Sequence, residues 1–207
     1  HGLAVPQSIE TTVRDHARLP ALRTYDNDRL KWDDRTFDAI YWDVFGDVYS
    51  KMHKRRNFIT KFCFFNLPTG DRLHRRNPSY DDRCPTCHLP NEKDDHILQC
   101  PSPARRAWRS DLIQTILKPI DSFLDPVLID ILREGLLRFF QDESIDPAPY
   151  PPRYQRPLKQ QRSICWNNLL RGKFSEEWKY LQEQHCTRQH RKMNNNQRQW
   201  MTKLLRT

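Results

Sequence analysis

The chain has 207 residues, of which 37% are hydrophobic and 29% charged, and a formal net charge of +9. This length suffices for one medium domain or two small ones, and the low apolar content favours helical modules joined by polar segments. No run of about 18 apolar residues occurs, which excludes a membrane-spanning helix, and the start HGLAVPQ lacks the pattern of a signal peptide. We therefore expect an intracellular protein that binds no membrane.

Positive charge is concentrated in two blocks. Residues 51–83 hold nine Lys or Arg against three acidic residues, and residues 153–207 hold thirteen against three. Such blocks favour phosphate backbones or acidic surfaces and imply salt-sensitive binding. A solvated surface without a partner is the other interpretation that charge alone allows.

In the first half of the chain, some segments show clear helical patterns and others show weak ones. Residues 1–32 show weak patterns that allow a short helix after Ser8, and the segment as a whole is predicted to be an irregular N-terminal segment. From Asp34, apolar residues at helical spacing predict an amphipathic helix that packs on a core. In the following helix, KMHKRRNFITKFCFF, an apolar stripe is predicted from Phe58, Phe62 and Phe65.

Two helices are predicted after Cys100. Ser102 is placed to cap the first and Asp125 to cap the second, and each is followed by Pro at the first helical position. Trp108 is expected on the buried face of the first helix. Two adjacent helices of this kind imply a helical hairpin.

The remainder of the chain divides at residues 142–157, DESIDPAPYPPRYQRP, whose five prolines predict an extended linker. Residues 158–207 are predicted to form a basic helical tail, partly disordered because its end is rich in Asn and Gln. The predicted fold class is mainly α: helical hairpins around one small knuckle, with a Pro-rich linker and a basic tail. The knuckle, residues 84–100, lies within a helical domain spanning 33–141.

The knuckle carries the most specific signal, the spacing Cys84-x2-Cys87-x8-His96-x3-Cys100. The short gap lets two thiolates face one point, and the three-residue gap places His96 and Cys100 one helical turn apart. Three sulfurs and one nitrogen form the closed tetrahedral set that suits Zn²⁺. A complete set leaves no position for a reacting water, so a single structural zinc and no catalytic residue are predicted.

Contacts with nucleic acid are expected beside the knuckle, because its acidic insert HLPNEKDD has no aromatic residue on which a base could stack. The predicted phosphate contacts are Arg72, Arg75, Arg76, Arg83, Arg105 and Arg106.

The string CPTCHLPNEKDDHILQCPSPARRAW resembles the zinc-binding domain downstream of the reverse transcriptase in non-LTR retrotransposons, with Cys-x2-Cys, an acidic stretch, His-x3-Cys and then a helix with a Trp. ITKFCFFNLPTGDRLHRRNP and CWNNLLRGKFSEEWKYLQ are similar to segments of retroelement polyproteins, so the resemblance covers about residues 33–183. It implies that this chain is the carboxy-terminal portion of such a polyprotein and contacts the backbone of RNA or DNA. We expect the protein in the nucleus rather than the cytoplasm.

Two other functions stay open. A protein-interaction module would use the zinc only to shape its scaffold. A restriction-like endonuclease would need a Glu-x-Lys on a strand, and Glu177-Trp178-Lys179 matches those letters within a helical pattern, with Asp121, Asp125 and Asp130 as candidate partners. The prediction is therefore a non-catalytic chain.

Overall fold

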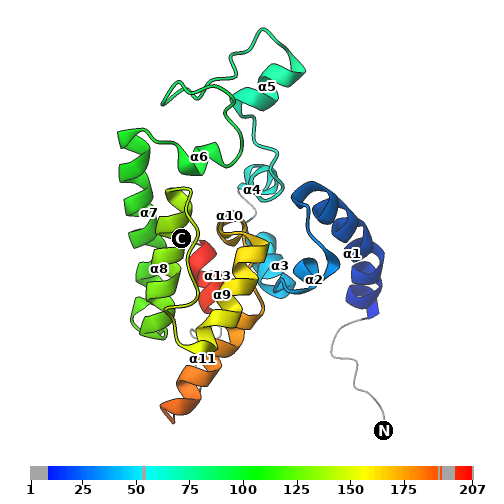
Figure 1. Cartoon of the computed structure of the whole chain (residues 1–207). Helices are drawn as coiled ribbons and strands as arrows, with labels where there is room; N and C mark the ends of the chain where they lie inside the picture. The colour runs from blue at the N-terminus through cyan, green and yellow to red at the C-terminus, as the bar shows by residue number, and fades with distance from the viewer. Residues whose placement is uncertain (1–8, 53–54, 191, 193–198, 207) are drawn as a thin grey trace.

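The computed structural model describes residues 9–52, 55–190, 192 and 199–206, and shows an assembly of helices (Figure 1). The helices are α1 Ile9–Leu30, α2 Asp34–Asp38, α3 Trp42–Lys51, α4 Arg56–Cys63, α5 Gly70–Arg76, α6 His96–Gln99, α7 Pro103–Asp121, α8 Pro126–Phe140, α9 Pro152–Ile164, α10 Trp166–Leu170, α11 Glu177–Arg188 and α13 Trp200–Arg206. No strand occurs in the described ranges, and the predicted mainly α class is confirmed. Among these helices, none has the length and apolar character that a membrane crossing requires.

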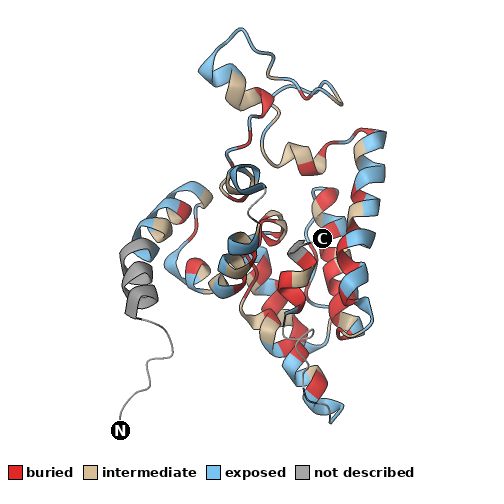
Figure 2. Ribbon diagram, turned by 180° about the vertical axis from the view of Figure 1, so that it is seen from behind, coloured by how far each residue is buried: buried red, intermediate tan, exposed pale blue. Residues whose placement is uncertain are grey.

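The core is built on the hairpin of α7 and α8, against which α13, α10 and α6 pack. As predicted, the Ser102 side chain caps α7 by accepting a hydrogen bond from the Arg105 amide at 3.3 Å, and Asp125 caps α8 through the Val127 amide at 3.1 Å. Figure 2 shows that buried residues gather in this body, whereas α5 and the loops beside it are mostly exposed. We call residues 67–101 the knuckle lobe; most of it projects from the body, whereas its helix α6 packs against α8.

Gly135 of α8 allows the close approach of α10. A Cβ atom at Gly135 would lie 2.1 Å from the ring of Trp166, which is 6% exposed. Gly135→Ala is therefore expected to lower the free energy of unfolding by about 1–3 kcal/mol through overpacking. Gly46→Ala in α3, where nothing lies within 4 Å, should instead raise it by up to ~1 kcal/mol. Urea unfolding of both variants measures the difference, and a neutral Gly135→Ala would contradict the packing.

The N-terminal segment differs from the prediction, because Ile9–Leu30 forms one helix of 22 residues where a short helix after Ser8 and then an irregular segment were expected; residues 1–8 lie outside the described ranges. Tertiary contacts hold this helix. Lys173 and Asp26 form an ion pair at 3.4 Å with side chains 0% and 2% exposed. Burial lowers the pKa of Lys173 and raises that of Asp26. The partner lies far along the chain, so local patterns could not reveal the helix.

The Pro-rich segment also differs from the predicted linker. Ile145 is 3% and Tyr154 0% exposed, and both belong to the main core. Helix α9 begins at Pro152, and the Tyr154 hydroxyl donates to Asp125 Oδ2 at 2.5 Å. Proline suits the first turn of a helix as well as an extended chain, so proline content alone could not distinguish the two.

The predicted tail is part of the same core. Trp200 is 1% and Leu204 2% exposed, and α13 packs on α3 and α7. One cluster joins these residues with Val44 and Trp178, so the division into a domain at 33–141 and a tail at 158–207 does not match the packing. The predicted disorder falls mainly on residues 191 and 193–198, which lie outside the described ranges.

Two aromatic residues that were predicted to lie on apolar helix faces are exposed. Phe58 is 55% and Trp108 40% exposed, although helical spacing had placed both on apolar faces. Spacing finds the apolar face of a helix, but only the packing of other elements decides how much of that face is covered.

Candidate metal centre

Four ligand-type side chains converge in the knuckle lobe. Donor atoms of Cys84, Cys87, His96 and Cys100 all lie within 4.8 Å of one another, and they form the one such Cys, His or carboxylate group found among the described residues. The Cys84 and Cys100 Sγ atoms are 3.9 Å apart, and Cys87 Sγ is 3.2 Å from His96 Nε2. The predicted ligands are thus brought together, and the cluster could hold a metal ion.

The donor set fits a tetrahedral ion. With metal–sulfur bonds of about 2.3 Å and metal–nitrogen bonds of about 2.0 Å, tetrahedral zinc places two sulfurs roughly 3.8 Å apart and a sulfur and a nitrogen roughly 3.5 Å apart. The measured 3.9 Å and 3.2 Å are close to these values. Cys84 and Cys100 are 2% and 1% exposed, so water has little access to that side of the cluster.

A tight turn presents the first two ligands. The Cys84 amide donates to the Leu89 carbonyl and the His88 amide to the Cys84 carbonyl, both at 2.9 Å. The Thr86 amide points at Cys84 Sγ at 3.5 Å. His88 closes the turn with φ 59° and is exposed, outside the cluster.

The short helix α6 presents the other two ligands. His96 is its first residue and Cys100 its C-cap. Burial tends to raise the pKa of Cys100, but hydrogen bonds from Ser102 and the neighbouring thiols outweigh it, so this pKa lies below its usual value. Burial, with contributions from the thiols of Cys100 and Cys84, raises the pKa of Cys87.

The acidic insert between Cys87 and His96 forms hydrogen bonds and an ion pair with other residues of the knuckle lobe. Glu92 accepts from the Gly70 amide at 2.9 Å, and Asp94 accepts from the Leu67 amide at 3.2 Å. Asp94 also pairs with Arg72 at 3.1 Å. These carboxylates therefore accept hydrogen bonds from backbone amides of the segment that leads into α5, which helps to explain why the insert is acidic.

Asp95 joins the lobe to the body. It precedes ligand His96, and its carboxylate lies 3.1 Å from the Arg171 guanidinium. The same carboxylate accepts two bonds from the Asn167 amide group, at 3.0 and 3.1 Å. Arg171 is fully buried, and its other donors reach the Phe62 and Asn167 carbonyls at 3.0 Å. Burial, partly offset by Asp95, lowers the pKa of Arg171.

The six arginines predicted to contact phosphates are not equivalent. Arg72 has only 17% of its side chain exposed and is paired with Asp94. Arg75 pairs with Asp71 at 2.6 Å, although 67% of its side chain is exposed. Of the two, Arg75 lines an open cavity of about 350 Å³, which is also bounded by Phe65, Asp71, Lys93, Asp94 and Asp95. Because its acids outnumber its bases, this cavity does not favour a phosphate.

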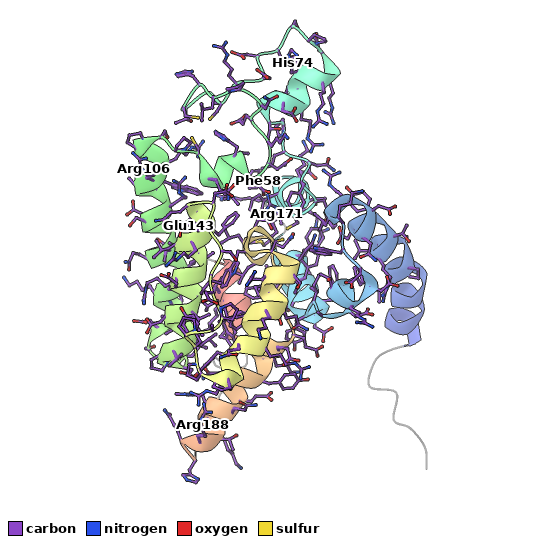
Figure 3. The ribbon with its side chains drawn as sticks, in the orientation of Figure 1. Phe58, His74, Arg106, Glu143, Arg171 and Arg188 are labelled. Atoms are coloured by element: carbon purple, nitrogen blue, oxygen red, sulfur yellow. The ribbon has the colours of Figure 1, made fainter. Side chains whose placement is uncertain are left out.

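The other four arginines lie nearer to solvent. Arg83 is 63% exposed and lies 4.0 Å from Asp81, and the Arg105 guanidinium is 5.9 Å from the Trp108 ring. Arg76, at the end of α5, and Arg106, in the first turn of α7, are exposed and form no ion pair with any described residue. Figure 3 shows Arg106 and, on α5, His74 at the surface.

The residues of the nuclease alternative do not form a metal site. Glu177 lies in α11 and pairs with Arg156 at 2.6 Å. Asp125 is a helix cap, and Asp130 pairs with Arg133 at 2.7 Å. No cluster of three potential ligands includes these carboxylates or Asp121 within the described ranges.

Arg171 is the residue that sequence reasoning missed. It directly follows the short helix Trp166–Leu170, a position typical of many exposed helix ends, so nothing local indicated a buried partner. Asp95 was recognised only as part of an acidic stretch.

Comparisons of this chain with protein-family models, with curated proteins and with solved structures give no match. The similarity to retroelement knuckles therefore rests on residues of this chain and remains a proposal.

Proposed function

We propose that Cys84, Cys87, His96 and Cys100 hold one structural Zn²⁺, and that the chain is a non-catalytic nucleic-acid-binding portion of a retrotransposon-derived reverse-transcriptase polyprotein. The observation that carries the metal assignment is the convergence of three thiols and one imidazole within 4.8 Å. Zinc bound there would orient α6 and the tight turn. All four positions are taken by protein, so the ion acts on the fold rather than on a substrate.

Support for nucleic acid as the partner comes from charge that the protein does not use internally. Arg76 and Arg106 are exposed and unpaired with described residues, on two helices that flank the knuckle in sequence. By contrast, Arg171 and Lys173 of the second basic block are buried in ion pairs. The block at 51–83, together with Arg106 on the other side of the knuckle, is therefore the better candidate surface, and binding there would be to the nucleic-acid backbone, without base-level specificity.

The salt dependence of binding tests this function. RNA and DNA affinity should fall steeply with salt, and Arg76→Gln combined with Arg106→Gln should reduce the slope of log K against log salt by about 2. Fluorescence anisotropy with labelled oligonucleotides measures both. Arg133→Gln combined with Arg138→Gln removes the same charge from α8, where both arginines are in ion pairs, and serves as the control.

Absence of binding at about 50 mM salt would reject the function and favour the protein-interaction module. An equal decrease of the salt slope in the two double variants would show that binding depends on the net charge of the protein and not on the position of Arg76 and Arg106 beside the knuckle. Plasmid cutting with Mg²⁺ that Glu177→Ala abolishes would instead establish the endonuclease alternative.

A further inference from the structure

An ordered stack of flat side chains connects the body to the surface of α4. The rings of Phe58 and Phe62 are parallel, with an interplanar angle of 3° and centroids 6.2 Å apart. The Arg171 guanidinium lies 5.0 Å from the Phe62 ring and 3.8 Å from the Phe65 ring. Figure 3 shows Phe58 and Arg171 in the same part of the molecule, between α4 and α10.

The inner end of this stack is held in place. Arg171 is completely buried and donates to the carbonyls of Phe62 and Asn167 and to Asp95. Phe65 is 9% exposed. Because Arg171 cannot change its position without losing these bonds, the face that it offers to Phe62 is pre-organised.

The outer end of the stack is open to solvent. Phe58 is 55% exposed, so one end of an ordered aromatic column faces water. A flat, apolar ligand that covers Phe58 would extend the column and remove apolar surface from water.

The surroundings of Phe58 are positive. Residues 48–70 contain five Lys or Arg and no Asp or Glu. Arg55, Arg56 and Lys61 are exposed, and none of the three forms an ion pair with a described residue. Arg55 and Lys61 lie three residues before and after Phe58, about one helical turn away, whereas the Arg56 guanidinium lies 5.6 Å from the Tyr49 ring. A ligand that covers Phe58 therefore has Arg55 and Lys61 beside it and no carboxylate of the same segment.

We propose that Phe58 is a stacking platform for an unpaired base of single-stranded nucleic acid, whose phosphates are contacted by Arg55 and Lys61. The inference rests on the proposed function and specifies its substrate class. A phenyl ring stacks on any base and needs no hydrogen bond, so the platform tolerates all sequences. In a duplex the base faces are covered by neighbouring pairs, so Phe58 contributes to single-strand binding alone.

Phe58→Ala tests the platform. It should weaken binding of an unstructured oligouridine, and of oligothymidine as the DNA arm, about tenfold. Binding to a hairpin duplex and the salt slope should not change, because no phosphate contact is removed. Phe58→Trp should retain or increase single-strand affinity. Tyr180→Ala, at a side chain 44% exposed on α11, is the matched control and should bind as the unaltered protein does.

The outcomes separate this inference from the proposed function. If the unaltered protein binds no nucleic acid, both fail. If it binds but Phe58→Ala has no effect, or weakens duplex binding equally, the platform fails and the proposed function stands. Circular dichroism and zinc content of Phe58→Ala should equal those of the unaltered chain, since an exposed ring contributes little to folding.

Discussion

Replacing Cys100 with serine is expected to abolish stoichiometric zinc binding and to unfold the knuckle lobe, while the helical body stays folded. Cys100 is 1% exposed and sits 3.9 Å from Cys84 across the cluster. Zinc in comparable small sites stabilises the fold by roughly 10 kcal/mol or more. A serine hydroxyl does not replace a thiolate as a ligand for this ion.

The loss should be local because the lobe has little core of its own. Its buried apolar side chains outside the ligand set are few: Leu67 and Leu98 are 6% and 4% exposed. In the body, by contrast, apolar residues of the α7 and α8 hairpin and of other helices, including α3 and α13, form one large buried cluster. Without zinc, the lobe therefore lacks the burial needed to offset the entropy of ordering its loops.

Elemental analysis gives the zinc content, and hydrogen exchange localises the change. We expect rapid exchange within 67–101 in Cys100→Ser, and in the unaltered protein after chelation, with protection retained in α8. Cys165→Ser, which removes an exposed thiol outside the cluster, should keep its zinc and its protection. Full zinc content in Cys100→Ser would contradict the assigned ligand set.

Replacing Arg171 with methionine is expected to lower the free energy of unfolding by about 3 kcal/mol. The side chain is fully buried, and its removal leaves the Phe62 and Asn167 carbonyls without their donor. The ion pair itself should account for the smaller part. Asp95 has 42% of its side chain exposed, so water screens the attraction.

Denaturant unfolding of Arg171→Met, Asp95→Asn and the double variant separates these contributions. Asp95→Asn alone should cost about 1 kcal/mol or less, and the double variant should lose less than the sum of the two single variants. Zinc content should stay complete, because no ligand is changed. Arg162→Met, at an exposed position on α9, is the control. An Arg171→Met variant as stable as that control would contradict the proposed anchoring.

Local patterns predicted the parts of this protein that local physics controls. Ser102 and Asp125 were recognised as helix caps because a cap bonds to an amide two or three residues away. The convergence of the four candidate metal ligands was predicted because a tight turn and one helical turn already bring each pair together. The α7 and α8 hairpin followed from two adjacent apolar faces.

Patterns failed where partners lie far apart in the chain. Helix α1 depends on Lys173, and α13 fills a space between α3 and α7. The Pro-rich segment was predicted to be extended because nothing local showed that Tyr154 would meet Asp125. Phe58 was assigned to an apolar stripe, but the packing of the other elements leaves it 55% exposed.

The sequence by itself determined the cluster of three thiols and an imidazole, because the covalent chain holds those residues within a few turns of one another. Only the tertiary structure decided that Asp95 would meet Arg171, 76 residues away, and that the resulting stack would end at an exposed Phe58. The physical reason is that burial and long-range ion pairs depend on which surfaces meet after collapse. No spacing rule within a single segment contains that information.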